Sequence, residues 1–72
     1  MVNVNKLKGK IVECGTSVQE LSEKLNINQS TFYRKLNENG ETFLIREADI
    51  IARELNLTCA ELNAIFFAQY VA

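Results

Sequence analysis

The feature that most constrains this chain is the three-residue connection Asn26-Ile27-Asn28 between two short segments with helical periodicity. In the segment before it, Leu21 and Leu25 lie four residues apart, and in the segment after it, Phe32 and Leu36 repeat that spacing. Apolar residues at this spacing form one face of a helix. Because three residues cannot make a wide turn, the two helices are expected to cross steeply with these faces together, as in a helix-turn-helix.

Polar residues around this connection predict where the two helices begin and end. The sequence Ser17-Val18-Gln19-Glu20 has the form of a capping box, in which a serine and a glutamate each accept a hydrogen bond from the other's amide. Asn26 tolerates the left-handed backbone that ends a helix, and Asn28 is a favourable N-cap. Ile27 and Phe32 have the spacing of a hydrophobic staple around that cap. We therefore expect a helix-turn-helix over about residues 17–37.

Three further helices are predicted by the same kind of evidence. The first covers about residues 3–14 and ends at Gly15, another covers about 45–55 after a loop at 37–42, and the last begins with the capping box Thr58-Cys59-Ala60-Glu61. Their inner faces are expected at Val4, Leu7, Ile11 and Cys14, at Ile45, Ala48, Ile51, Ala52 and Leu55, and at Leu62, Ile65, Phe66 and Gln69. The prediction is an all-α fold of five short helices in a single domain, residues 1–72. The apolar run at 64–72 is the one segment for which a strand is an alternative to a helix.

The composition argues against an enzyme. A chain of 72 residues buries only a modest core, which leaves little room for the pocket of a small-molecule substrate. Histidine is absent, and no pair of nucleophile and base is visible, so we expect no catalytic activity. The two cysteines, Cys14 and Cys59, are too few for a zinc site. We expect them to be reduced core residues, and we expect neither a metal ion nor a cofactor.

The apolar residues are too dispersed for a membrane protein. No run of about 18 apolar residues is present, so no membrane span is expected. The first six residues, Met1-Val2-Asn3-Val4-Asn5-Lys6, lack the apolar stretch of a signal peptide. These observations predict a cytoplasmic location.

The net charge of −1 is unevenly distributed along the chain. Residues 1–40 hold six basic and four acidic side chains, a balance of +2, whereas residues 41–72 hold two basic and five acidic side chains, a balance of −3. The local field at a docking surface matters more than the total charge. The first part of the chain is therefore suited to a nucleic acid, and the second part to facing away from it.

The predicted helix after the connection has one side that carries only neutral polar and basic residues, from Asn28 to Asn37. Glutamine can form two hydrogen bonds with an adenine edge, and serine or threonine can contact several bases. We therefore expect Gln29 and Ser30, and secondarily Thr31, to read bases. Basic and polar side chains contact phosphates. Contacts with the DNA backbone are expected from Ser17, Asn28, Tyr33, Arg34, Lys35 and Asn37.

The stretch from Ser17 to Leu36, with the later runs Phe43–Thr58 and Ile65-Phe66-Phe67, resembles a known family. It is similar to the lambda-repressor and Cro-like helix-turn-helix regulators, especially the short ones of phages from Gram-positive bacteria. The resemblance implies a transcriptional regulator, Cro-like or a minimal repressor, in a bacterial cell. Such a protein inserts the second helix of the motif into the major groove of double-stranded operator DNA.

Individual positions of the family pattern fall on particular residues of this chain. Its small helix residue falls on Ser22, and its turn glycine falls on Asn26. Its first base-reading positions fall on Gln29 and Ser30. The chain departs from the pattern at Val18, where relatives carry a glutamine that braces the reading glutamine. The resemblance therefore leaves Gln29 without its usual support.

The end of the chain carries a second apolar side. Phe67, Tyr70 and Val71 lie off the predicted core face of the last helix, and a small domain cannot bury both faces. We expect these residues to form a homodimer interface, which would place two recognition helices about one turn of DNA apart. Two alternatives stay open. The tail could fold back on the core, or the chain could be a protein-binding module whose helix-turn-helix is a scaffold.

Overall fold

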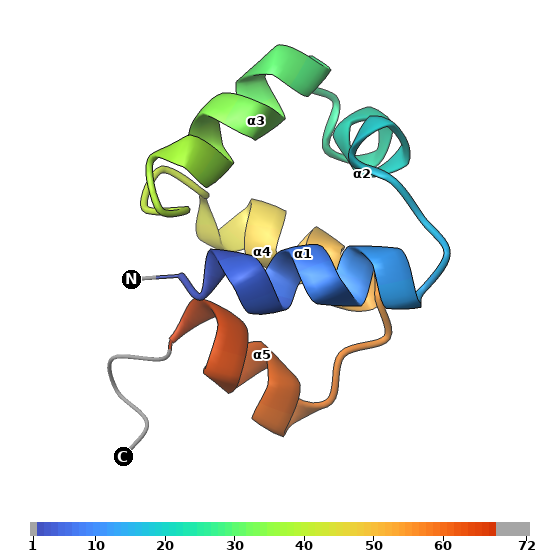
Figure 1. The fold of residues 1–72 in the computed structure, drawn as a ribbon, viewed down its shortest axis with the longest axis vertical. Helices are drawn as coiled ribbons and strands as arrows, with labels where there is room; N and C mark the ends of the chain where they lie inside the picture. Colours follow the sequence, from blue (N-terminus) through green and yellow to red (C-terminus); the bar gives the residue numbers. More distant parts are fainter. Residues whose placement is uncertain (1, 68–72) are drawn as a thin grey trace.

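The protein is represented by a computed structural model, which describes residues 2–67 and shows five helices and no strand in that range (Figure 1). The helices are α1 (Val4–Glu13), α2 (Val18–Leu25), α3 (Gln29–Asn37), α4 (Ile45–Glu54) and α5 (Cys59–Phe66). The predicted all-α fold of five helices is confirmed for these residues. None of the helices has the length and apolar character needed to cross a membrane.

Helix α1 runs across the middle of the molecule in Figure 1, and the main contacts between helices join α2 to α3 and to α4, and α1 to α5. In that view, α2 and α3 lie on one side of α1, α5 lies on the other side, and α4 lies behind it. The residues predicted to form the helix-turn-helix are thus at the opposite end of the molecule from α5. This arrangement leaves one side of α3 without a helix packed against it.

The core takes at least one side chain from every helix. Leu7, Leu21, Phe32, Ile51 and Ile65 come from α1 to α5 in turn, and each is at most 1% exposed. Burying a side chain of this size contributes roughly 1.5–3 kcal/mol to folding. Since five short helices share one cluster, no helix is expected to be stable without the others.

A row of three aromatic rings connects α3 with α5. The ring of Phe43 meets that of Phe32 at 5.3 Å and that of Phe66 at 6.3 Å between centroids, both edge to face. Edge-to-face pairs of this kind add about 0.5–1.5 kcal/mol to the burial of the rings. The loop that carries Phe43 is therefore held between the two ends of the molecule.

Three residues predicted to face the core lie at the surface instead. Ile45 is 83% exposed, and both Cys14 and Cys59 are exposed free thiols. The reason is their place at the helix ends: Ile45 and Cys59 are the first residues of α4 and α5, and Cys14 is the C-cap of α1. A helical repeat predicts the side on which a residue lies, but not whether the core extends that far along the helix.

The predicted capping boxes form to different extents. At α5 the box is complete, because Thr58 Oγ1 accepts from the Glu61 amide at 3.1 Å and Glu61 Oε1 accepts from the Thr58 amide at 2.9 Å. At α2 only half of the box forms. Ser17 Oγ accepts from the Glu20 amide at 3.2 Å, but the Glu20 carboxylate accepts from the Thr16 hydroxyl at 2.8 Å.

The end of α3 requires glycine at position 40. Gly40 has a left-handed φ of +70°, and its N–H donates to the carbonyl of Lys35 at 2.8 Å. A Cβ atom at this position would lie 2.5 Å from the Cβ of Val2. Both the backbone conformation and the neighbouring side chain therefore exclude a larger residue.

We predict that Gly40→Ala lowers the free energy of unfolding by about 2 kcal/mol or more, because left-handed strain adds to the clash with Val2. Gly15→Ala is the matched control, since Gly15 has the same φ with open space around it. Gly15→Ala should lower the free energy of unfolding by only about 1 kcal/mol. Gly9→Ala, in the open middle of α1, should stabilise by about 0.5–1 kcal/mol. Urea denaturation measures all three, and equal losses at Gly40 and Gly15 would contradict the steric argument.

An ion pair joins α1 to α5 near the start of α5. Lys10 Nζ lies 2.6 Å from Glu61 Oε2, and these side chains are 18% and 32% exposed. The hydrogen bond from Lys10, together with that from the Thr58 amide, lowers the pKa of Glu61 from 4.5 to about 2. The same bond raises the pKa of Lys10.

We predict that acid weakens the fold through Glu61. Because its folded pKa lies below its unfolded pKa, the pair stabilises the fold above pH 4.5, and this contribution is lost as the pH falls from 4.5 towards about 2. The variant Glu61→Gln keeps an acceptor for the Thr58 amide but has no charge to lose. Urea midpoints measured across this pH range should therefore fall less steeply for Glu61→Gln than for the wild type. Parallel curves would show that Glu61 does not carry the effect.

Candidate nucleic-acid interface

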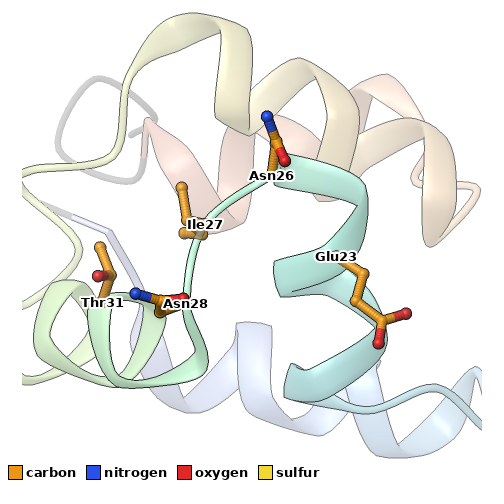
Figure 2. A pocket seen from close by; sticks show the side chains of 5 residues that line it. All are labelled: Glu23, Asn26, Ile27, Asn28 and Thr31. Carbon is orange, nitrogen blue, oxygen red and sulfur yellow. The ribbon is translucent and has the colours of Figure 1, made fainter.

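The turn between α2 and α3 has the geometry that its sequence predicts. Asn26 ends α2 in the left-handed conformation, with φ 60° and ψ 41°. The Ile27 amide donates to the Ser22 carbonyl at 3.0 Å, and Asn28 is extended, which starts α3 in a new direction. Figure 2 shows the chain leaving α2 and entering α3 through these three residues. The Asn28 side chain makes no capping hydrogen bond, so it is available to a ligand.

An open hollow of about 480 Å³ lies at this turn. It is lined by Glu23, Asn26, Ile27, Asn28 and Thr31 (Figure 2). The carboxylate of Glu23 makes this hollow unfavourable for a phosphate, because like charges repel. The candidate interface is therefore not the hollow itself but the exposed side of α3 beyond it.

The buried side of the two helices fixes the orientation of α3. Phe32 is completely buried, and Leu36 is 3% exposed. On α2, the hydroxyl of Ser22 is buried and donates to the Val18 carbonyl at 2.7 Å. The small side chain of Ser22 allows α2 and α3 to pack closely. Its hydroxyl needs no partner outside α2, because it forms its hydrogen bond within that helix.

The other side of α3 meets solvent. Gln29, Ser30, Tyr33 and Arg34 are exposed, and Thr31 is half-buried. Asn28 and Asn37 are exposed at its two ends. None of the residues from 28 to 37 is acidic. The structure thus leaves on one surface nearly all of the α3 residues predicted to read bases or contact phosphates.

Lys35 is the exception, and the prediction that it shares this surface is wrong. Its side chain is buried, and its ammonium lies 2.9 Å from Glu47 Oε1 and 3.0 Å from the carbonyl of Thr42, to which it donates. The ammonium also lies 5.7 Å from the centre of the Phe43 ring. Lys35 precedes the buried Leu36 in α3, and the loop after α3 folds back over the side of the helix on which Lys35 lies. A charged residue next to the core face is therefore enclosed.

Glu47 is the partner that the sequence patterns did not reveal. Its carboxylate accepts from Lys35 and, at 2.8 Å, from the Leu44 amide at the start of α4. Burial by itself raises the pKa of Glu47, but the hydrogen bonds from the Leu44 amide and from Lys35 outweigh burial and lower it. A glutamate at the third helical position is a known capping signal. Here the signal is obscured because the N-cap residue is Leu44, which cannot complete a box.

We predict that Glu47→Gln costs about 3–5 kcal/mol in the free energy of unfolding, because it leaves the Lys35 ammonium buried without a counter-charge. The double variant Lys35→Met/Glu47→Gln should recover a large part of that loss. Asp49→Asn, which breaks the exposed Asp49–Arg53 pair at 3.2 Å, is the control and should cost less than about 1 kcal/mol. Urea denaturation distinguishes these cases. The single variant Lys35→Met completes the cycle. If the double variant lost as much unfolding free energy as Lys35→Met and Glu47→Gln lose together, the two side chains would not be coupled.

Charges around the exposed side of α3 are modest. Arg34 pairs loosely with Glu38 at 3.5 Å, and both side chains are exposed. Of the six basic residues in the first 40, Lys10 and Lys35 are held by acids of the later part of the chain. The contrast of +2 and −3 between the two parts is therefore smaller at the surface than along the sequence. Any electrostatic attraction of a polyanion would be weak.

A second groove, of about 390 Å³, separates α1 from α3 and the start of α2. Its surface is mainly apolar, with polar groups supplied by Lys8, Thr16, Ser17 and Tyr33. The oxygen of Ser17 already accepts from the Glu20 amide, but its hydroxyl hydrogen is free to donate. The predicted backbone contacts Ser17 and Tyr33 thus line one groove next to the exposed side of α3.

The predicted dimer residues are only partly within the described range. Phe67 is 39% exposed, directly after the buried residues Ile65 and Phe66. Tyr70 and Val71 lie outside the described residues, as does Gln69, which was predicted to close the core. The possibility of a strand beyond residue 67 lies outside them too.

Comparisons with protein-family models, curated proteins and solved structures find no match to this chain. Over residues 2–67 the structure also contains no group of three or more potential metal ligands. Function is therefore inferred from the surface of α3 and its surroundings.

Proposed function

We propose that this protein is a sequence-specific DNA-binding transcriptional regulator that inserts α3 into the major groove of operator DNA. The observation that supports this proposal most strongly is the exposed, acid-free side of α3 from Asn28 to Asn37. A helix about 10–12 Å wide fits the major groove, which is roughly 12 Å wide. The buried Phe32 and Leu36 hold this helix from behind. The resemblance to Cro-like and minimal phage repressors points in the same direction.

The exposed residues divide into two roles. Gln29 and Ser30, in the first turn of α3, would read base edges, and the half-buried Thr31 would assist them at the rim. The remaining polar residues would fix the position of the helix on the phosphates without reading sequence. These are Ser17, Asn28, Tyr33, Arg34 and Asn37. Lys35 is excluded from this group because Glu47 and Thr42 hold its ammonium.

The weak local charge has a consequence for affinity. Arg34 would exchange Glu38 for a phosphate, and a loose, exposed ion pair can be given up at little cost. Few phosphate contacts imply a shallow salt dependence and modest affinity for a single copy. A regulator of this kind gains from presenting two copies of α3 to one operator.

We predict that Gln29→Ala costs about 1–3 kcal/mol in binding to an operator and much less on unrelated DNA, because it removes base contacts only. The operator can be sought in the DNA flanking the gene or by selection from random duplexes. Arg34→Ala is the control for a phosphate contact. It should weaken binding to all sequences alike and reduce the slope of affinity against salt by about one. Equal losses on both DNAs for Gln29→Ala would refute base reading.

A second candidate, a protein-binding module, is favoured by one observation. Phe67, at the end of the mainly apolar helix α5, is partly exposed. In that case the helix-turn-helix would be a scaffold. A titration with operator duplex followed by amide chemical shifts separates the two functions. Shifts over residues 28–37 support DNA binding. Shifts confined to α5 with a protein partner, and none with DNA, support the module.

A further inference from the structure

Three of the helices are followed by an asparagine with a left-handed backbone. Asn26, Asn39 and Asn56 come at the ends of α2, α3 and α4, with φ angles of 60°, 61° and 51°. In each case the amide of the next residue donates back to a carbonyl of the helix, at 3.0, 2.8 and 2.9 Å in turn. This hydrogen bond belongs to the Schellman motif and satisfies a carbonyl at the helix end. Of the three asparagines, only Asn39 is followed by glycine.

An asparagine that precedes a glycine can deamidate spontaneously. The backbone nitrogen of the glycine attacks the side-chain carbonyl carbon of the asparagine, and the side-chain nitrogen leaves as ammonia with the proton that the backbone nitrogen lost. Water then opens the cyclic imide at one of its two C–N bonds, which gives aspartate or isoaspartate. Glycine permits the attack because no Cβ atom crowds its nitrogen. After Asn26 and Asn56, the corresponding nitrogens belong to the branched residues Ile27 and Leu57.

The native fold restrains the nitrogen that would react at Asn39. The Gly40 N–H donates to the Lys35 carbonyl at 2.8 Å, and Gly40 is buried against the side chain of Val2. Figure 1 shows the loop after α3 next to the start of the chain. Asn39 itself is exposed, so it meets solvent while the attacking nitrogen does not. That nitrogen can lose its proton to water only after the end of α3 separates from its neighbours.

We propose that Asn39 is a site of spontaneous deamidation and that the fold gates the reaction through the end of α3. Because the chemistry is slow compared with local opening, its rate follows the fraction of molecules in which this end is open. In the unfolded chain the restraint is absent, and the rate is set by the sequence alone. The proposal concerns the chain itself and stands whether or not the protein binds DNA.

The modification damages the same end of α3 that gates it. Either product places a carboxylate after the last turn of the helix, beside Glu38, where the helix dipole disfavours negative charge. Isoaspartate also adds a methylene group to the main chain before Gly40, which displaces Gly40 from the Lys35 carbonyl and from Val2. The damage reaches the residue whose ammonium is buried against Glu47. The modified chain therefore opens more easily, and refolding does not reverse the change.

Mass spectrometry of peptides from the full chain tests the site. Samples kept in urea are digested, and deamidation is located by peptide mass and by separation of the isoaspartate and aspartate forms. Modification at Asn39 should be about tenfold or more faster than at Asn26 and Asn56, and Gly40→Ala should slow it to their level. This comparison uses the unfolded chain, so Gly40→Ala does not have to fold. Equal modification at all three asparagines would overturn the proposed site.

The gate is tested by the same measurement in native buffer. The folded chain should deamidate at Asn39 about tenfold or more slowly than the chain in urea. Val2→Ala removes the methyl groups that cover Gly40, so it should raise the native rate by about threefold or more and leave the rate in urea unchanged. Val12→Ala is the matched control, because Val12 is 78% exposed in the last turn of α1. It should change neither rate.

The effect of the modification on the fold is measured separately. Anion exchange isolates the modified chain, because it carries one more negative charge than the unmodified chain. Its urea midpoint should lie below that of the unmodified chain. Equal rates in native buffer and in urea would overturn the gate, and so would equal native rates for Val2→Ala and Val12→Ala. A modified chain as stable as the unmodified one would overturn the proposed damage to α3.

Discussion

The buried pair of Lys35 and Glu47 is the interaction on which the rest of this structure depends. The Lys35 ammonium is held by the Glu47 carboxylate and the Thr42 carbonyl, and that same carboxylate accepts from the amide of Leu44, the N-cap residue of α4. Three segments, α3, the loop after it and α4, therefore meet at a single carboxylate. Because charges buried without a partner cost several kcal/mol, neither α3 nor α4 can shift without breaking the pair. The orientation of the exposed side of α3 follows from this constraint.

The same pair also reduces the positive charge that α3 presents to solvent. Two acids of the later part of the chain hold bases of the earlier part, Glu47 at Lys35 in the interior and Glu61 at Lys10 near the surface. Both pairs stabilise the contact between segments that are distant in sequence. Both also remove positive charge that would otherwise attract phosphates. The two pairs stabilise the fold but weaken the positive field around α3, so the proposed reading of DNA would depend on positioned side chains more than on general charge.

The part of the candidate site that could be predicted from the sequence depends on relations between residues close together in the chain. Gln29, Ser30 and Arg34 are exposed because Phe32 and Leu36 define the buried side of a helix whose start is set by a three-residue turn. These relations span at most four residues and can be derived from spacing. The sequence patterns failed at Lys35, Ile45 and the two cysteines, where burial depends on what packs against the helix end. Periodicity gives the direction of a side chain, but it does not give the position of a distant segment.

The sequence by itself determined the five helices, the complete capping box of α5, the left-handed turn at Asn26 and the acid-free side of α3. Each of these depends on interactions between residues close in the chain, which follow from residue type. Only the tertiary structure decided that Lys35 is enclosed by Glu47, that Gly40 must accommodate Val2, and that Leu44 and Ile45 lie exposed. These outcomes depend on which remote segments meet. Contacts of that kind are set by the packing of the whole core, and no local pattern records them.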